Sequence, residues 1–247
     1  MILDLLRERG SISVAAVEEQ FDVSPMTARR DLALLAESGY ARRTHGGAIL
    51  PELAGHEDSF QSRVEQDTEA KSRLAKAVAE TLAPDETIFV DSSSSAYFVV
   101  REVLELGTPL TVLTNSLPVM SLVGGSNAPQ VELIGIGGSF RKLTRSYVGA
   151  EAVRMVGRFF VDQIVFSVKG IEMEGYLTDP DPLEAEVKRA MIDRARSVLL
   201  VAQAQKFNER GLNVIVPASQ VDIAFLSDPP PAGVRVLESA GADVVAV

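Results

Sequence analysis

The chain has 247 residues, of which 46% are hydrophobic and 23% charged, with a formal net charge of −10 and no cysteine. This length accommodates two domains, and the absence of cysteine excludes disulfide and thiolate chemistry. No apolar run reaches the ~18–20 residues that a membrane helix needs, and Met1 to Gly10 lacks a signal-peptide pattern. We therefore expect a cytoplasmic protein with no membrane partner.

The acidic charge is distributed unevenly along the chain. Residues 1–50 carry a net charge of −1, whereas residues 51–247 carry −9. In the first part the arginines come in pairs, at Arg29-Arg30 and at Arg42-Arg43. A local basic stripe can bind DNA phosphates although the whole chain is acidic, so the net charge does not exclude DNA binding.

Three helices and a hairpin are predicted in the first 50 residues. The first helix begins near Ile2 and ends at Arg9-Gly10, and Ser13 is expected to cap a second one over residues 14–20. Ser24-Pro25 are typical of the N-cap and first turn of a third helix, with an apolar stripe at Ala28, Leu32 and Leu35. Short strand-like runs around His45-Gly46-Gly47 predict the hairpin. This order indicates a winged helix-turn-helix over residues 1–50.

The third helix and the hairpin carry the candidate DNA contacts. A recognition helix needs donors on its outer face, and arginine can bind guanine with two hydrogen bonds. An arginine pair alone is more often a solvated face, but the order of the elements around it favours DNA. The predicted DNA-binding residues are Ser24, Met26, Thr27, Arg29 and Arg30 on the helix, and Arg42, Arg43 and His45 on the wing.

Two separated blocks of this region resemble one known family. They are residues 24–32, SPMTARRDL, and residues 43–48, RTHGGA, and together they look like the signature of the DeoR family of bacterial regulators. The resemblance implies that residues 13–32 are the helix-turn-helix proper. Ala28 stands where the family usually has isoleucine. Family members usually carry a few more residues, often basic, before the first helix, so we expect either a start further upstream or a reduced affinity for DNA.

The rest of the chain is expected to be an α/β domain. Residues 51–68 are mixed and polar and are predicted to be a linker. In residues 69–247, short β-branched runs alternate with helical segments, which is typical of an α/β fold with a mostly parallel sheet.

Small, hydroxyl or cationic residues follow several of the predicted strands. Ligands of open parallel sheets bind beyond the carboxyl ends of the strands, and the N-terminus of a helix suits phosphate. Each segment alone is an ordinary loop, but together they could line one pocket for an anion. The predicted effector-binding residues are Asp91, Ser92, Ser93, Ser94, Ser95, Thr114, Asn115, Gly137, Gly138, Arg141, Lys169, Gly170 and Lys206.

The family resemblance extends into this second part. Residues 90–92, 113–117, 137–138 and 184–191 look like the DeoR-family sensor, which is similar in fold to ribose-5-phosphate isomerase. The resemblance implies a phosphorylated sugar or related metabolite as effector, and a repressor that leaves its operator when the effector binds. The chain departs from the family at Ser93, where glycine is usual, at Lys169, where a small residue is usual, and at residues 203–206, QAQK, where Asp-x-Ser-Lys is usual. These departures predict either an unusual effector or a loss of effector sensing.

Three functions are compatible with the sequence. The first is a repressor of a carbohydrate-metabolism operon that binds double-stranded operator DNA and is released by a phosphorylated sugar. The second is a DNA-binding regulator whose larger domain only oligomerises, and the third is a sugar-phosphate isomerase-type enzyme. Gln203, Gln205 and the absence of histidine beyond His56 argue against an enzyme. We expect a homo-oligomer, dimer or tetramer, with no cofactor and no metal, because the two isolated histidines cannot form a metal site.

Overall fold

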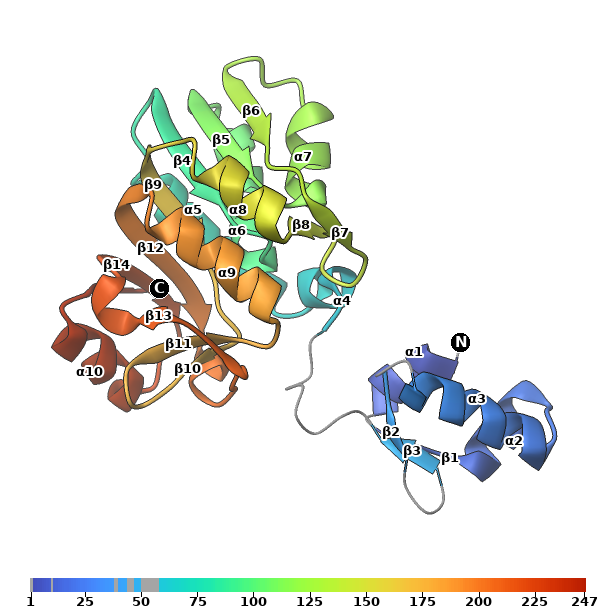
Figure 1. Cartoon of the computed structure of the whole chain (residues 1–247). Helices are drawn as coiled ribbons and strands as arrows, with labels where there is room; N and C mark the ends of the chain where they lie inside the picture. The colour runs from blue at the N-terminus through green and yellow to red at the C-terminus, as the bar shows by residue number, and fades with distance from the viewer. Residues whose placement is uncertain (1, 10, 38–39, 44–46, 50–57) are drawn as a thin grey trace. The chain divides into compact units, whose positions relative to one another are not determined.

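The computed structural model describes residues 2–9, 11–37, 40–43, 47–49 and 58–247, and the chain forms two compact units. The first unit extends to Glu57 and the second from Asp58 to Val247 (Figure 1). Within the described residues, no helix is both long and apolar enough to cross a membrane.

The first unit contains three helices and a small antiparallel sheet. Its strands lie in the order β1-β3-β2, with β3 paired to both neighbours. Its elements are α1 (Ile2–Arg9), β1 (Ser11–Ser13), α2 (Val14–Phe21), α3 (Pro25–Glu37), β2 (Arg42–Arg43) and β3 (Gly47–Ile49). This arrangement confirms the predicted winged helix-turn-helix, and it adds β1, which the sequence analysis does not predict.

The second unit is built on a seven-stranded sheet in the order β15-β14-β12-β9-β4-β5-β6, with every neighbouring pair parallel. The mostly parallel α/β architecture is therefore confirmed. The strands are β4 (Glu86–Val90), β5 (Leu110–Thr114), β6 (Val131–Gly135), β9 (Val161–Phe166), β12 (Ala195–Gln203), β14 (Ile223–Ser227) and β15 (Asp243–Ala246).

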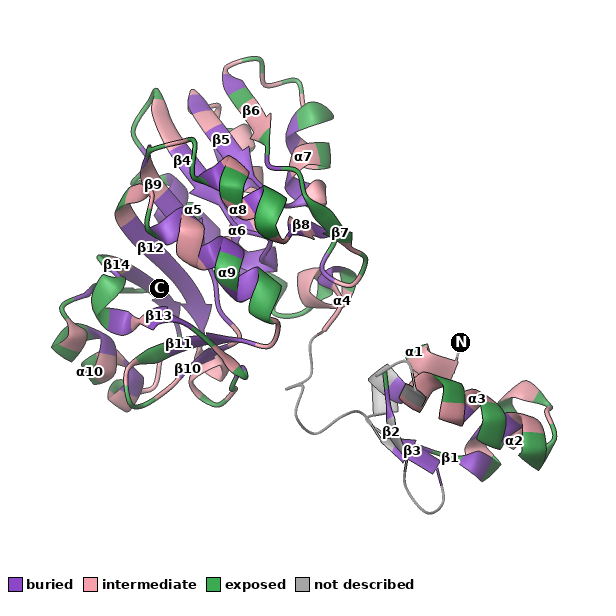
Figure 2. Ribbon diagram, in the orientation of Figure 1, coloured by how far each residue is buried: buried purple, intermediate pink, exposed green. Residues whose placement is uncertain are grey.

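Helices cover both faces of this sheet, because successive strand residues point to opposite sides. Ile88 and Val90 pack with α5 (Thr68–Ala79), α6 (Ser94–Leu106) and α7 (Leu117–Gly124). Phe89, between them, packs on the other side with α8 (Ala150–Val156), α9 (Pro182–Ile192) and α10 (Pro231–Ala240). Figure 2 shows the sheet buried between these two helical layers.

Smaller elements lie beside the main sheet. Strands β10 (Gly170–Ile171), β11 (Tyr176–Asp179) and β13 (Asn213–Pro217) form an antiparallel sheet, and β7 (Ser139–Arg141) pairs with β8 (Ser146–Val148). Short 3-10 helices, η1 (Ala204–Phe207) and η2 (Ala218–Gln220), flank β13. None of these strands, nor α8, is predicted from the sequence, because such short segments show no clear hydrophobic period.

Helix α4 (Phe60–Glu65) lies in the segment that the sequence analysis expects to be a linker, residues 51–68. Ser59 caps it by accepting a hydrogen bond from the Ser62 amide, and Phe60 is buried. The segment predicted to be a linker therefore contains a helix at residues 60–65, which belong to the second unit, whereas residues 50–57 lie outside the described residues.

Candidate functional site

Helix α3 presents a polar face over an apolar back. Ser24 begins the helix by accepting a hydrogen bond from the Thr27 amide, at 3.2 Å from its Oγ atom. Behind the helix, Ala28 and Leu32 are completely buried in the core of the first unit. The left-handed backbone of Asp22, with φ of 50°, makes the tight turn from α2 into α3.

The outer face of α3 is open to solvent. Met26 is 77% exposed, and Arg29 and Arg30 are also exposed. An exposed N-terminal face of the second helix is the part of a helix-turn-helix that enters the major groove. Of the predicted wing residues, Arg42 and Arg43 lie on strand β2, and His45 lies outside the described residues.

The second candidate site lies at the carboxyl ends of the central strands of the large sheet. Strands β12, β9, β4 and β5 are parallel neighbours, so the residues that follow them meet at one edge. This edge collects Gln203, Ser167, Asp91 and Asn115, all at least 97% buried. Helix α9 adds Glu184 and Lys188, whose burial the sequence analysis does not predict.

Asp91 is held in a buried charge network. Its Oδ1 accepts a hydrogen bond from the Ser93 amide at 3.0 Å, and its Oδ2 lies 3.4 Å from Nζ of Lys188. Nζ of Lys188 also lies 2.7 Å from Oδ2 of Asp179 and donates to the carbonyl of Ser167. Burial raises the pKa of Asp91, and the Lys188 ammonium opposes this rise. Burial alone would lower the pKa of Lys188, but Asp179 and Asp91 together raise it, so Lys188 stays charged.

Glu184 is the centre of a second buried network. Its carboxylate accepts hydrogen bonds from the hydroxyls of Ser92 and Ser146 and from Nη1 of Arg141, the last at 3.1 Å. Nη2 of Arg141 lies 3.1 Å from Oδ2 of Asp181. The predicted effector residues Ser92 and Arg141 are therefore joined through a carboxylate that sequence reasoning missed.

The serine run opens α6. Ser93 caps the helix by accepting from the Ala96 amide, and Ser95 accepts a hydrogen bond from the side chain of Gln203 at 3.1 Å. All four serines, from Ser92 to Ser95, are buried. The predicted serines thus lie next to Gln203, and the hydroxyls of Ser92, Ser93 and Ser95 bond to protein groups.

Next to the serines, Asn115 and Gly138 line the same edge. The amide nitrogen of Asn115 donates to the carbonyl of Tyr147, while its buried Oδ1 has no partner within the described residues. A Cβ on Gly138 would lie 2.6 Å from the carbonyl oxygen of Val148, so only glycine fits there. Gly137 faces open space, and Thr114 caps the turn by accepting from the Ser116 amide.

Lys169 and Lys206 meet at one carboxylate. Nζ of Lys169 lies 3.1 Å from Oε1 of Glu209, and Nζ of Lys206 lies 2.9 Å from Oε2. Lys71 is buried nearby and donates to the carbonyls of Arg63 and Gln66. Sequence reasoning missed Arg63, Lys71 and Glu209, because only the fold brings α4, α5 and residues 208–212 to these strand ends.

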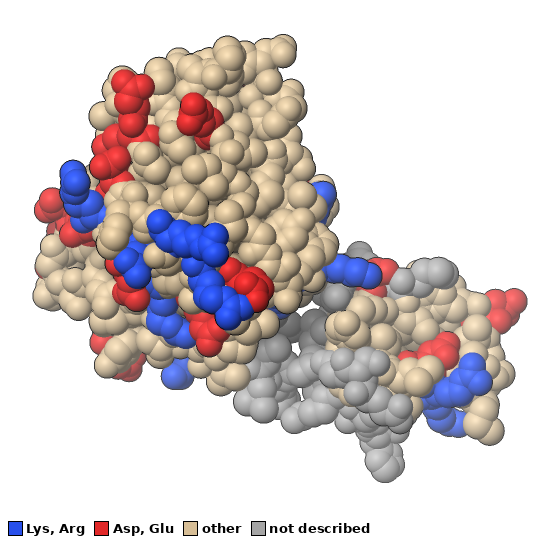
Figure 3. All heavy atoms as spheres, turned by 45° about the horizontal axis from the view of Figure 1, so that its top comes forward, with Lys and Arg blue, Asp and Glu red and all other residues tan. Residues whose placement is uncertain are grey.

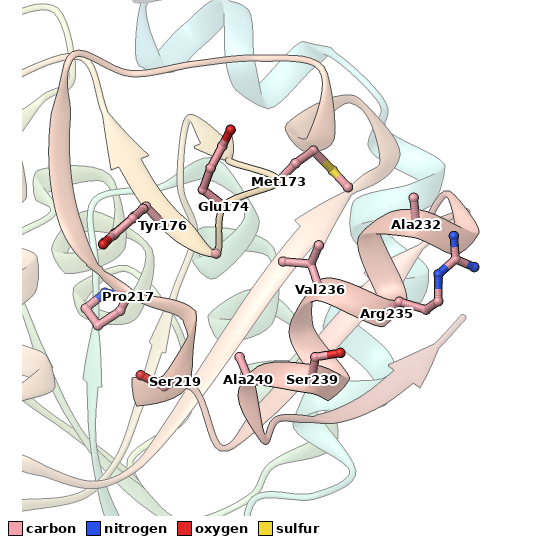
Figure 4. Close-up of a pocket in the computed structure, with 11 residues that line it drawn as sticks. Met173, Glu174, Tyr176, Pro217, Ser219, Ala232, Arg235, Val236, Ser239 and Ala240 are labelled. Carbon is pink, nitrogen blue, oxygen red and sulfur yellow. The ribbon is translucent and has the colours of Figure 1, made fainter.

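A separate hollow of about 690 Å³ lies between the β10–β11 turn and α10 (Figure 4). Its lining includes Met173, Tyr176 and Val236, with one acidic side chain, Glu174, and one basic side chain, Arg235. None of the predicted effector residues lines it. Its mixed, nearly neutral lining does not favour an anion.

Charges on the surface are mixed. Figure 3 shows Lys and Arg side chains next to Asp and Glu side chains on the larger unit.

Among the described residues, no group of three or more histidine, aspartate or glutamate side chains is arranged to hold a metal ion.

Two family models match the chain. A DeoR-like helix-turn-helix domain matches residues 1–53, and a DeoR C-terminal sensor domain matches residues 66–228. The chain belongs to the DeoR family. Its DeoR-family membership makes it a transcriptional regulator with a DNA-binding unit and a sensor unit, and it confirms the family resemblance.

Curated relatives of this DeoR-family chain cover nearly its whole length. The glycerol-3-phosphate regulon repressor of Escherichia coli (strain K12) is 31% identical over 94% of this chain and 91% of its own. The HTH-type transcriptional repressor CsqR of Escherichia coli (strain K12) is 33% identical over 95% and 88%. The L-fucose operon activator of Haemophilus influenzae is 29% identical over 91% and 89%. All three are named as regulators rather than enzymes.

Solved structures give weaker likenesses to this DeoR-family chain. A ribose 5-phosphate isomerase A from Methanocaldococcus jannaschii has a TM-score of 0.42 at 12% identity, covering 57% of this chain and 55% of its own. The translation initiation factor eIF-2B of Pyrococcus horikoshii has a TM-score of 0.45 at 14% identity, covering 90% and 84%.

Proposed function

We propose that this protein is a cytoplasmic transcriptional repressor that binds operator DNA as a homo-oligomer and is released by a phosphorylated sugar or related metabolite. The proposal rests on the arrangement of α3. Arg29 and Arg30 are exposed on its outer face, while Ala28 and Leu32 on its inner face are buried in the core of the first unit. Two of the relatives described above are named repressors, and one repressor is named for glycerol 3-phosphate.

The proposed DNA contacts are Ser24, Met26, Thr27, Arg29 and Arg30 on α3 and Arg42, Arg43 and His45 on the wing. The proposed domain division assigns residues 1–50 to DNA binding and residues 69–247 to sensing and oligomerisation. Paired half-sites on DNA require symmetric protomers, which is why we propose an oligomer.

The proposed effector site is the strand-end edge with its buried serines and cations. A phosphate there would meet the N-terminus of α6 and the ammonium groups of Lys169 and Lys206. In the mechanism, the effector binds one arrangement of the oligomer more tightly and so weakens DNA binding by population shift.

Fluorescence anisotropy with labelled DNA from the protein's own promoter region tests the DNA-binding half. The proposal predicts binding at low salt whose affinity falls steeply with salt concentration, because bound lysines and arginines release counterions from DNA. Absence of binding at low salt would refute it.

A second candidate function is a regulator whose larger unit only oligomerises. The observation in its favour is that Arg141, Lys188 and Lys206 already pair with Glu184, Asp91 and Glu209. Under this function, a panel of sugar phosphates would leave the melting temperature unchanged, whereas an effector raises it. Turnover of ribose 5-phosphate would instead favour an enzyme.

A further inference from the structure

Four cationic side chains converge beside the ends of β9 and β12. Lys169 follows β9, Lys206 lies on η1 after β12, and Arg63 and Lys71 come from α4 and α5. Lys169 and Lys206 share the Glu209 carboxylate, and Nζ of Lys71 donates to the carbonyl of Arg63 at 2.5 Å. Lys206 also interacts electrostatically with Lys169 and Arg63, and Lys71 with Lys206 and Arg63, so the four form one cluster. We call Arg63, Lys71, Lys169 and Lys206 the cation cluster.

The cation cluster is largely shielded from water. The side chains of Lys169 and Lys206 are 13% and 15% exposed, and Lys71 is 4% exposed. Burial lowers the pKa of Lys206 and that of Lys71, the latter to about 8. Bringing four positive charges together in such a place is unfavourable unless an anion offsets them.

Among the described residues, Glu209 is the anion that lies closest to the two lysines at the strand ends. Its two carboxylate oxygens are both used, one by Lys169 at 3.1 Å and one by Lys206 at 2.9 Å. Burial alone would raise the pKa of Glu209, but the two lysines outweigh burial and hold it below its ordinary value. Asp58 lies further from Lys169, at 3.9 Å, and the carboxylate of Asp67 accepts from Gln205.

Glu209, Asp58 and Asp67 together still leave part of the cation cluster without an acceptor. Within the part of the chain that the structure describes, Nε and Nη2 of Arg63 are buried and have no hydrogen-bond partner. Arg63 contacts the ring face of Phe60, with its guanidinium carbon 6.0 Å from the ring centroid. A phosphate group has three acceptor oxygens and up to two negative charges, so it offers one oxygen and one charge more than a carboxylate.

The backbone holds Glu209 in this place. A Cβ on Gly170 would lie 2.1 Å from the Glu209 carbonyl oxygen, so the chain at Glu209 packs directly on the residue after Lys169. On the other side, the Gly211 amide donates to the hydroxyl of Thr178 at 2.9 Å. The carboxylate is therefore placed at the lysines by a packed segment, yet it can leave by rotating its own side chain.

We propose that Glu209 is a built-in competitor that occupies a phosphate-binding site formed by the cation cluster. The phosphate of the effector takes the place of the Glu209 carboxylate on Lys169 and Lys206, and its additional oxygen accepts from Arg63. The inference rests on the proposed function, and it adds that the ligand-free site is filled by the protein's own anion. Arg63 and Lys71 belong to the first two helices after the DNA-binding unit, so the exchange alters bonds next to the connecting segment.

Isothermal titration of the full chain with inorganic phosphate tests the inference. The variant Glu209→Gln keeps the shape of the side chain but removes its charge, and Glu209→Ala removes the side chain beyond Cβ. We expect both to bind phosphate about tenfold more tightly than the wild type, because no ion pairs have to be broken first. The control Glu132→Gln removes one negative charge on β6, the far edge of the sheet, and is expected to match the wild type.

Two outcomes would overturn the inference. One is phosphate affinity within about twofold of the wild type in both Glu209 variants, when their thermal melts show a folded protein, since displacing a largely buried ion pair costs more than that. The other is an equal gain in Glu132→Gln, which would make the effect one of net charge. Adding Lys206→Met to Glu209→Gln is expected to abolish the gain.

The same variants separate this inference from the proposed function. If a sugar phosphate releases DNA from the wild type while the Glu209 variants gain no phosphate affinity, the competitor role fails and the repressor function stands. If the variants gain phosphate affinity but no sugar phosphate releases DNA, the site stands and the effector response fails.

Discussion

The ammonium of Lys188 on α9 lies 3.4 Å from the carboxylate of Asp91 at the end of β4, and both side chains are nearly fully buried. Asp179 binds the same ammonium at 2.7 Å. One cation thus pairs with two buried carboxylates and ties a helix to the centre of the sheet. The network fixes the strand ends at which we place the effector.

Replacing Lys188 by methionine is expected to destabilise the second unit. Asp91 and Asp179 would remain buried without a counter-charge, which costs about 3–5 kcal/mol. Urea denaturation followed by circular dichroism measures the loss. The matched control is Lys142→Met, an exposed lysine whose replacement should change the free energy of unfolding by less than about 0.5 kcal/mol. Equal effects of the two changes would contradict the network's role.

Replacing Arg29 or Arg30 by alanine is expected to weaken binding to promoter DNA by about 1–3 kcal/mol without lowering stability. Both side chains are exposed, so their loss leaves the core of the first unit intact. Anisotropy titration gives the affinity and a thermal melt gives the stability. Arg196→Ala is the charge-matched control, because Arg196 is 84% exposed on β12 of the other unit. Unchanged affinity in both α3 variants would remove α3 from the interface.

Gly170 is expected not to tolerate a side chain. In Gly170→Ala the new Cβ would lie 2.1 Å from the Glu209 carbonyl oxygen, so the segment around Glu209 must shift, at a cost of about 1–3 kcal/mol. Gly137→Ala is the control, since its Cβ would meet no atom within 4 Å. Differential scanning calorimetry compares the two. A melting temperature lowered equally in both variants would contradict the packing described.

Lys71 should make stability depend on pH above neutrality. Its pKa is lowered mainly by burial, from 10.5 to about 8, so between these values the unfolded chain binds more protons than the folded one. Stability from this group therefore rises as the pH increases from about 8 to 10.5. Melting temperatures of the wild type and of Lys71→Met, measured across this range, should show the wild type gaining relative to the variant. A difference that is constant with pH would contradict the prediction.

The sequence predicts the main helices and strands well where interactions between residues close in the chain determine the structure. Ser13 and Ser24 cap the two helices of the helix-turn-helix as expected, since capping depends on residues three positions away. The alternation of strands and helices likewise predicts the parallel sheet. The β10-β11-β13 sheet is missed because Gly170–Ile171 is too short to show a period of two.

The site is predicted only in part. The strand ends place Asp91, Asn115 and Lys169 on one edge, which follows from the parallel order alone. The residues of α9 that contact this edge cannot be predicted in the same way. Glu184 and Lys188 have the sequence pattern of a solvated helix face, but both are buried in the fold. No pattern in the sequence predicts that Arg63 and Glu209 lie near the same lysines, since that requires the tertiary structure.

The most direct test of the account is a gel shift of the purified protein on its own promoter region, titrated with a set of sugar phosphates. We expect retarded DNA that one phosphorylated sugar releases, while the same sugar without phosphate leaves the DNA bound. Retarded DNA that no phosphorylated compound releases would contradict the sensing role of the second unit. DNA that is not retarded even at low salt would contradict the assignment of α3 as the recognition helix.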